Sequence, residues 1–344
     1  MEVHFVDVGL GTCQIIHLGN REAIVIDCGI RSDEIAAKAL KRLGVDRIVR
    51  LITSHSDNDH IGGAPTILND YQGCIDQILA VQDHKWLDST YWKRIAYFID
   101  QGVIDADNVK RLELTQNHKP RLVWSTPQGS SLRLVSPSFF RNQTAQQNHT
   151  SNGTSAVFIL DHCGRRVVFA GDSEIPQWRE IYKQRQTAGL GTLKCDLLAV
   201  PHHGGLLDGN DADMDWLYYQ VVRSEFAVLS VGTRKNPKHP RPEIITRLLK
   251  AGSKVLCTEL TSLCHDRPLT LLPAVLRPQT EFGRGYIDSK RKRPRCVACM
   301  GNIVATLSPA GCDVRRLNEH QQAVRGLAGQ PGGKPMCLAT VKVV

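Results

Sequence analysis

The sequence predicts an α/β fold in which strands deliver polar side chains to one edge of a sheet. Four short apolar runs, at residues 23–29, 48–53, 167–172 and 197–205, each lead into an aspartate or a histidine. Runs of this kind, rich in β-branched residues, are typical of buried strands. Helical patterns at Ser32–Leu43 and Pro242–Ala251 alternate with such runs, which favours sheets covered by helices.

The second run is followed by a dense group of metal-binding side chains. The segment from Ser54 to Gly63 holds four strong ligands within six residues, His55, Asp57, Asp59 and His60. Nitrogen and oxygen donors without thiolate suit Zn²⁺ or Mn²⁺. The alternating spacing favours two ions, because adjacent residues cannot all point at the same one. The alternative is a polar loop with solvated histidines.

The other three runs end in residues of the same chemistry. They lead to Asp27, to Asp172 and to the pair His202 and His203. A capping aspartate in a turn would explain any one of them alone. Because a rigid sheet gathers the ends of its strands at one edge, the four together favour a single site.

Further short motifs accompany these runs, and the whole set resembles one known family. They are Asp7-Val8-Gly9-Leu10-Gly11-Thr12-Cys13, Asn152-Gly153-Thr154-Ser155, Gly171-Asp172, Pro201-His202-His203-Gly204, Ser230-Val231-Gly232, Asn236 and His239-Pro240. With the His-x-Asp-x-Asp-His core they resemble the metallo-β-lactamase fold superfamily. Within it, they resemble the metal-dependent hydrolase domain of the competence protein ComEC and its soluble relatives.

The resemblance covers residues 1–262 and implies an αββα sandwich, with two mixed sheets face to face and helices outside. Residues 263–344 then form a basic C-terminal extension packed on this core. The sequence departs from the pattern of many superfamily members at Asp57, which stands in place of a histidine. A later histidine is replaced by Asn152 with Ser155. The branch also often has Gln-Gly-Asp where Leu10-Gly11-Thr12 stands here.

The resemblance also implies roles for the ligands. One ion is expected at Asp59, His60 and His202, with Asp172 bridging to a second ion. The second site, near His55 and Asp57, is richer in oxygen and is expected to bind more weakly. The other expected residues around the ions are Asp27, Asn152, Ser155 and His203. Of these, Asp27 is expected to orient His55, because metal-bound histidines usually donate their other N–H to a carboxylate or carbonyl.

The predicted chemistry follows from this site. Two divalent ions lower the pKa of a bound water to about 7, so that hydroxide can attack phosphorus at neutral pH. Asp59 is the candidate to orient that hydroxide. His239 and Asn236 are candidates to stabilise the developing oxyanion or to protonate the leaving group. The alternative for these two is a turn rich in proline and asparagine.

The charge of the chain is uneven. The total is 43 − 34 = +9, made up of 23 − 27 = −4 over residues 1–233 and 20 − 7 = +13 over residues 234–344. Basic residues beside His239 are expected to bind a polyanionic substrate; these are Arg234, Lys235, Lys238 and Arg241. A second basic run, Lys290–Arg295, is expected to be a solvated loop or part of the same surface.

Cysteine usage predicts reduced thiols, because the count of 11 is odd. A structural zinc site is predicted at Cys264, His265, Cys296 and Cys299, and the alternative is a strand that happens to contain cysteines. No apolar stretch reaches the roughly 20 residues of a membrane helix. The chain starts directly in strand-like sequence, without room for a signal peptide, so a cytoplasmic protein that does not bind membranes is expected.

The sequence thus predicts a metal-dependent phosphodiesterase or nuclease acting on DNA or RNA. One alternative is a hydrolase of a small anionic metabolite, such as a phosphate ester, cyclic nucleotide or lactone. Another is a non-catalytic partner protein of a multiprotein system. A salt-sensitive affinity for polynucleotide would separate the first function from the second.

Overall fold

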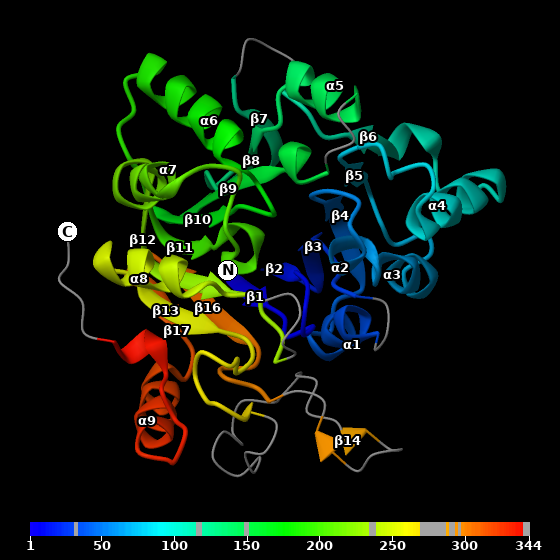
Figure 1. Ribbon diagram of the computed structural model, residues 1–344. Helices are drawn as coiled ribbons and strands as arrows, with labels where there is room; N and C mark the ends of the chain where they lie inside the picture. Colours follow the sequence, from blue (N-terminus) through cyan, green and yellow to red (C-terminus); the bar gives the residue numbers. More distant parts are fainter. Residues whose placement is uncertain are drawn as a thin grey trace.

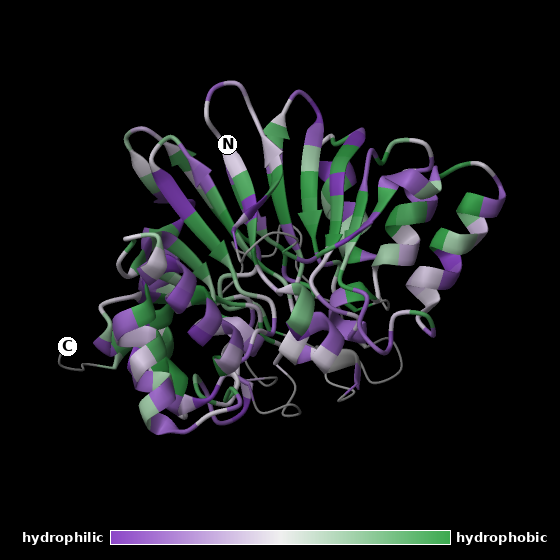
Figure 2. Cartoon of the chain, turned by 90° about the horizontal axis from the view of Figure 1, so that it is seen from above, coloured by the Kyte–Doolittle hydropathy of each residue, from purple (hydrophilic) through white to green (hydrophobic). Residues whose placement is uncertain are grey.

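Two mixed sheets pack face to face, with helices on their outer sides, in the computed structural model of the chain (Figure 1). The structure describes residues 1–30, 34–114, 119–147, 151–233, 239–268, 287–288, 293–294 and 297–339. Seen from above, the largely hydrophobic strands run between two groups of helices (Figure 2). The predicted αββα sandwich is confirmed.

The first sheet has eight strands in the order β17-β16-β1-β2-β3-β4-β5-β6. Their bounds are Gly311–Val314, Ile303–Ser308, Glu2–Phe5, Gln14–Gly19, Glu22–Ile26, Arg47–Thr53, Ile78–Ala80 and Val109–Arg111. Strands β3 to β6 are mutually parallel, whereas β1, β2, β16 and β17 pair antiparallel.

The second sheet has seven strands in the order β13-β12-β11-β10-β9-β8-β7. Their bounds are Lys254–Cys257, Val222–Leu229, Leu193–Ala199, Arg165–Phe169, Val157–His162, Ser131–Ser136 and Arg121–Ser125. Strands β10 to β13 are parallel and the others antiparallel. A separate two-stranded ribbon pairs β14, Ile287–Asp288, with β15, Arg293–Pro294.

Helices cover both outer faces. Around the first sheet lie α1 (Ile35–Arg42), α2 (Asn58–Ile61), α3 (Ala64–Asp70) and α4 (Thr90–Asp100). The remaining helices are α5 (Phe139–Gln147), α6 (Ile175–Thr187), α7 (Asp211–Trp216), α8 (Pro242–Lys250) and α9 (Leu317–Ala328). In the described ranges no helix is long and apolar enough to cross a membrane.

Alternation along the strands divides the apolar side chains between three clusters. In β3, Ile24 and Ile26 face the cluster between the sheets, whereas Ala23 and Val25 face the cluster under the helices of the first sheet. This follows from the period of two along a strand. Phe5 and Phe169 meet between the sheets with ring centroids 6.3 Å apart. The third cluster fills the space between the second sheet and its helices.

The chain after residue 262 contributes to the first sheet. Strand β16 pairs with β1, in a register that places Glu2 opposite Thr306, and β17 extends the sheet beyond it. Helix α9 packs against the cluster outside the second sheet through Val324 and Leu327. The segment predicted as an extension from residue 263 thus supplies two strands to the sandwich.

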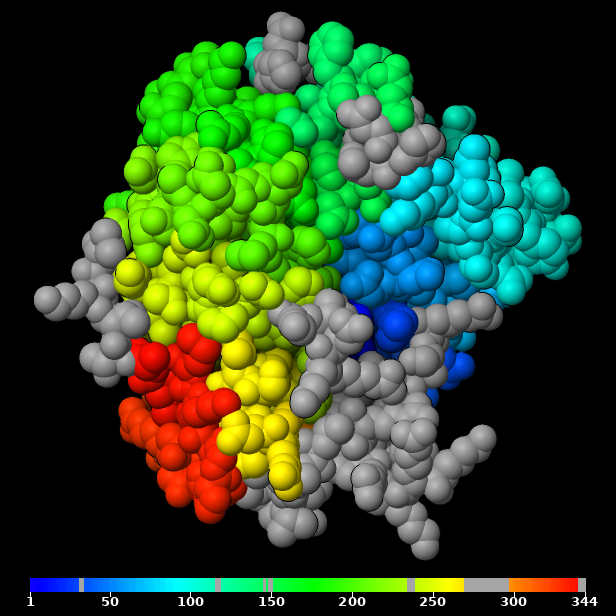
Figure 3. Space-filling model, in the orientation of Figure 1, coloured from blue at the N-terminus to red at the C-terminus, as the bar shows by residue number. Residues whose placement is uncertain are grey.

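The parallel strands of both sheets end near one another. The N-terminal part of the chain, blue to cyan, and the middle part, green to yellow, meet on one face of the molecule (Figure 3). Residues after β3 and β4 form a tight crossing there, because Cys28 N donates to His60 O at 2.6 Å and Gly63 N donates to Gly29 O at 3.0 Å.

This crossing leaves no room for a side chain at Gly63. A Cβ atom there would lie 2.2 Å from the carbonyl oxygen of Cys28. We expect Gly63→Ala to lower the free energy of unfolding by about 2 kcal/mol in urea denaturation, because backbone must move to relieve the overlap. Gly191→Ala is the matched control, since a Cβ at Gly191 has nothing within 4 Å. Equal midpoints for both variants would contradict the described crossing.

Candidate metal centre

Three strand ends deliver the polar residues of the centre. Strand β4 leads into Ser54 and His55, and the short helix α2 that follows carries Asp59 and His60. Strand β10 leads into Asp172. Strand β11 leads into a turn, Pro201–Gly204, that carries the histidine pair. The sequence prediction that separate apolar runs converge on one site is supported by this arrangement.

Three imidazoles and two carboxylates converge within ligand distance. His60 Nε2 lies 3.2 Å from Asp172 Oδ1, and His55 Nε2 lies 3.9 Å from Asp172 Oδ2. His203 Nε2 lies 3.4 Å from Asp59 Oδ2 and 3.6 Å from Asp172 Oδ1. Two overlapping groups result, each with its ligand atoms within 4.8 Å of one another: His55, His60 and Asp172, and Asp59, His60 and His203.

These ligand atoms fit a divalent cation. His55 Nε2, His60 Nε2, His203 Nε2 and Asp172 Oδ1 are all buried and make no hydrogen bond. A buried polar atom without a partner typically costs about 1–3 kcal/mol, so four in one place need an explanation. A cation bound among them would satisfy all four, and imidazole with carboxylate is a donor set suited to Zn²⁺ or Mn²⁺.

A second layer of hydrogen bonds fixes the rings. His60 Nδ1 donates to Asp27 Oδ2 at 2.7 Å, and His203 Nδ1 donates to Ser230 O at 2.9 Å. In both rings Nε2 is therefore directed into the centre. The expectation that Asp27 orients His55 is wrong, since its carboxylate binds His60 and both Ser54 N and Ser54 Oγ.

The geometry favours His203 over His202 as the ligand, contrary to the sequence expectation. Both residues adopt left-handed backbone conformations, with φ of 51° and 53°. This turns the His203 ring inward, where its side chain is 3% exposed. The His202 side chain is 24% exposed and lies 3.6 Å from Glu174 and 4.0 Å from Asp172. Burial lowers the pKa of His202, but Glu174 and Asp172 outweigh it and raise the pKa.

His239 lies beside this pair, as predicted. Its ring centroid is 5.2 Å from that of His202 and 6.4 Å from that of His203, and its buried Nδ1 has no hydrogen bond. Burial and the two neighbouring histidines lower the pKa of His239 to about 4. Asn236 and three of the predicted substrate-binding residues, Arg234, Lys235 and Lys238, lie outside the described residues.

The fourth predicted basic residue, Arg241, is tied to the same turn through its backbone. Arg241 N donates to Gly204 O at 2.8 Å, next to the histidine pair. The guanidinium lies 3.6 Å from Glu243. Arg241 precedes helix α8, so its position relative to the centre is fixed by the turn and the helix together.

Ser155 and Asn152 occupy different parts of the expected second site. Ser155 Oγ accepts a hydrogen bond from Asp172 N at 2.8 Å and lies 3.3 Å from His55 Nδ1. It therefore supports two candidate ligands at once. Asn152 begins a single 3₁₀ turn and accepts from Ser155 N through its backbone oxygen.

Asp57 is held by groups that the sequence reasoning missed. Its Oδ1 accepts from Lys85 Nζ at 2.6 Å and from Ser151 Oγ at 2.9 Å. Its Oδ2 lies 3.9 Å from His55 Nε2. Burial raises the pKa of Asp57, but His55, Lys85 and Ser151 outweigh it and hold the pKa below its usual range.

The pKa values of the other candidate ligands are shifted in opposite directions, downwards for the carboxyls and upwards for His60. Burial raises the pKa of Asp59 and of Asp172, yet the surrounding histidines hold both carboxyls well below their usual range. Burial lowers the pKa of His60, but Asp172 and Asp27 raise it well above normal. Burial and His60 together lower the pKa of His55. Anionic carboxylates are therefore present at neutral pH, as a cation site requires.

The predicted structural zinc site is not supported by the geometry. Both ring nitrogens of His265 are engaged with backbone, Nε2 with Pro331 O and Nδ1 with Arg267 N, each at 3.0 Å. Cys264 and Cys299 are buried among apolar side chains, and Cys299 Sγ lies 3.3 Å from His320 Nε2. Cys296 lies outside the described residues. Within the described ranges, the two groups above are the clusters of three or more ligands.

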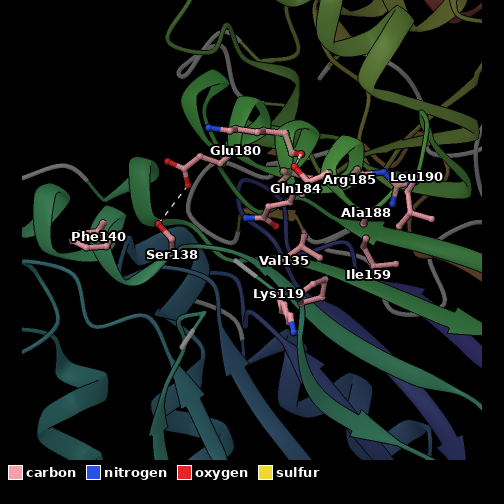
Figure 4. Close-up of a pocket in the computed structure, with 14 residues that line it drawn as sticks. Lys119, Val135, Ser138, Phe140, Ile159, Glu180, Gln184, Arg185, Ala188 and Leu190 are labelled. Atoms are coloured by element: carbon pink, nitrogen blue, oxygen red, sulfur yellow. Dashed lines mark hydrogen bonds between the residues drawn. The ribbon is translucent and has the colours of Figure 1, made fainter. Parts of the chain in front are cut away.

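A separate cavity of about 610 Å³ lies between helix α6 and the second sheet (Figure 4). Val135, Ile159 and Leu190 give it a largely apolar lining, and Glu180 and Arg185 lie at its wall. It shares no residue with the candidate metal centre.

The two histidines of the pair should differ in their effect on metal content. We expect His203→Ala to remove at least one tightly bound ion per chain, because it deletes a buried ligand. His202→Ala is the matched control and should retain the metal content of the unmodified protein, measured by plasma mass spectrometry after desalting. Metal loss in His202→Ala with retention in His203→Ala would reverse the assignment.

Comparison with known proteins agrees with the fold. The chain is 28% identical over 260 residues to recombination protein 2 of Haemophilus influenzae, an alignment covering 74% of this chain and 27% of that protein. It is 21% identical over 277 residues to ComE operon protein 3 of Bacillus subtilis, covering 75% and 32%. The chain thus spans about a third or less of the length of these curated relatives, and the similarity to competence proteins is confirmed.

Among solved structures, the Bacillus subtilis protein YhfI, described as a metallo-beta-lactamase fold protein, superposes with a TM-score of 0.44 at 12% identity. The superposition covers 74% of this chain and 95% of YhfI. The family assignment itself rests on the sequence model of the metallo-beta-lactamase superfamily, which matches residues 6–208, more than half of the chain. This protein therefore belongs to the metallo-beta-lactamase superfamily.

Proposed function

We propose that this protein is a metal-dependent phosphodiesterase with nucleic acid as its substrate class. The observation that carries the proposal is the set of four buried, unpartnered ligand atoms from His55, His60, His203 and Asp172. A cation held there would activate a water molecule for attack and neutralise charge on a phosphate group. Superfamily membership supports hydrolase chemistry in general, and the residues around the centre support the finer assignment.

Asp59 is the residue best placed to orient an attacking water. Its carboxylate lies 3.4 Å from His203 Nε2, and its side chain is 27% exposed, whereas Asp172 is buried at 7%. The two carboxylates thus differ: Asp172 lies at the bottom of the cluster and Asp59 faces its open side. An exposed carboxylate oxygen beside the ion site can accept a hydrogen bond from water and align it.

His239 is suited to stabilise charge rather than to deliver a proton. Because its pKa is about 4, the ring is neutral at pH 7. A neutral imidazole can donate one N–H to a developing oxyanion, but it does not supply a proton as an imidazolium does. Of the two roles predicted from sequence, oxyanion stabilisation is the one that we propose.

The preference for nucleic acid is supported by charge. Residues 234–344 carry 20 − 7 = +13, and this segment begins beside His239. A basic segment that begins beside the centre favours a polyanion through counterion release. The similarity to a protein named for recombination points in the same direction. A hydrolase of small anionic metabolites would gain less from a basic segment of this length.

The direct test uses metal-stripped protein resupplied with Mn²⁺ or Zn²⁺. We expect it to hydrolyse bis(p-nitrophenyl) phosphate and labelled single- or double-stranded DNA or RNA, with Asp59→Ala reducing turnover at least about 100-fold. Turnover of the small diester without cleavage of either nucleic acid would favour a metabolite hydrolase. Bound metal without any turnover would favour the non-catalytic alternative.

His239 should affect turnover but not metal binding. We expect His239→Ala to lower kcat by about 100-fold, the usual effect of deleting one oxyanion donor, while metal content stays unchanged. His239→Gln, which keeps an N–H donor, should recover part of the loss. An unchanged kcat in both variants would remove His239 from the reaction, and a loss of metal would make it a ligand instead.

A further inference from the structure

Lys85 contacts Asp57 at the edge of the candidate centre and has no role in the chemistry proposed above. It comes from the loop between β5 and α4. Its Nζ lies 2.6 Å from Asp57 Oδ1 and 3.1 Å from Ser151 Oγ. Since Ser151 Oγ also donates to Asp57 Oδ1 at 2.9 Å, this one oxygen receives two donors.

The position of Lys85 is built into the backbone. Asp83 is a buried carboxylate, 5% exposed, that accepts from Ser56 N through Oδ2 and from Lys85 N through Oδ1, both at 2.9 Å. Asp83 therefore connects the backbone of Ser56, the residue immediately before Asp57, to the backbone of Lys85. Because both ends of the Lys85–Asp57 pair are anchored by the same carboxylate, this contact differs from a chance meeting of two surface side chains.

Asp57 stands apart from the cluster of convergent ligands. Asp57 belongs to neither of the two groups of ligand atoms, although it lies in the same strand-end loop as several of their members. Its closest approach to a ligand atom in these groups is 3.9 Å, from Oδ2 to His55 Nε2. Asp59, two residues along, belongs to a group with His60 and His203. Of the two aspartates of the core motif, Asp57 thus pairs with a lysine and Asp59 lies with the candidate metal ligands.

We propose that Lys85 supplies the positive charge on the Asp57 side of the centre, in place of a second divalent ion. A lysine ammonium and a divalent cation placed on the same carboxylate repel each other, and the two hydrogen bonds to Oδ1 weaken Asp57 as a ligand. The chain accordingly holds one ion tightly, within the cluster of His55, Asp59, His60, His203 and Asp172. The proposal thus differs from the sequence expectation of two divalent ions.

The same lysine is placed to meet an anionic substrate. Its side chain is 47% exposed, while the carboxylate that it binds is 30% exposed. An ammonium at the rim of the ion site can therefore contact a phosphate oxygen while it remains near Asp57. This second role rests on the proposed function, whereas the charge-replacing role does not.

The test is a count of bound ions, made without any substrate. Metal-stripped protein is titrated with Mn²⁺ or Zn²⁺ by calorimetry, and the retained metal is measured after desalting. We expect about one ion per chain in the unmodified protein and about two in Lys85→Met, with the affinity for the second ion raised at least 10-fold. Lys85→Arg, which keeps the charge, should resemble the unmodified protein.

Lys254→Met is the matched control. Lys254 is 51% exposed and pairs with Glu225 at 3.1 Å, on strand β13 and away from the strand-end loops. Its replacement should leave the ion count at one. Asp57→Asn provides an independent variant if Lys85→Met does not fold. Because Asp57 is not needed for the tightly held ion, Asp57→Asn should also retain one.

Two results would overturn the inference. Two equally tight ions in the unmodified protein, unchanged by Lys85→Met, would show that the lysine does not replace an ion. Loss of an ion in Lys85→Met or in Asp57→Asn would show that Lys85 positions Asp57 as a true ligand. The outcome is separable from phosphodiesterase activity: if Lys85→Met gains an ion but no diester is hydrolysed, the lysine's role stands and the proposed function fails.

Discussion

The buried carboxylate of Asp27 is the interaction on which the centre depends. It accepts from Ser54 N, Ser54 Oγ and His60 Nδ1, each at 2.7 Å, and so joins the end of β3 to the end of β4 and to α2. A fully buried carboxylate is tolerated only when such donors surround it. Asp27 also holds a left-handed backbone, with φ of 58°, which is the kind of local strain that persists where surrounding contacts impose it.

Most of the centre was predictable because the topology of parallel strands is simple. Apolar runs that end in Asp27, His55, Asp172 and the histidine pair lie on two pairs of neighbouring parallel strands, β3 with β4 in the first sheet and β10 with β11 in the second. The ends of each pair meet at one edge of its sheet, and the two edges lie together where the sheets face each other. Which of two adjacent histidines points inward depends on backbone torsion angles, and the left-handed turn at Pro201–Gly204 has no signal in residue types alone. The partner of Asp27 was mistaken for a similar reason, since His55 and His60 both follow β4 and their spacing does not tell which ring faces Asp27.

Contacts between loops are harder to predict from the sequence. Lys85 follows a strand of only three residues, β5, and its Nζ contacts Asp57 directly. The backbone on both sides of this contact is held by Asp83, an arrangement that spacing along the chain cannot reveal. The cysteines and His265 illustrate the reverse error. Their spacing suggested a metal, but the backbone oxygen of Pro331, 66 residues away, takes the imidazole instead. The alternative to that zinc site, a strand over Cys296–Leu307, is closer to the structure, since β16 begins at Ile303 and its Ile303, Ala305 and Leu307 face the core.

The position of β1 has a consequence for how the chain acquires its structure. This strand lies between β2 and β16, and its partner residues in β16 are about 300 positions away, as in the pair Glu2 and Thr306. During synthesis one hydrogen-bonding edge of β1 therefore stays open until about 300 further residues have been made. Contacts of such long range slow folding, and an open strand edge is prone to pair with other chains. That edge is therefore exposed in partly synthesised chains, and β16 serves as its cover once it has been made.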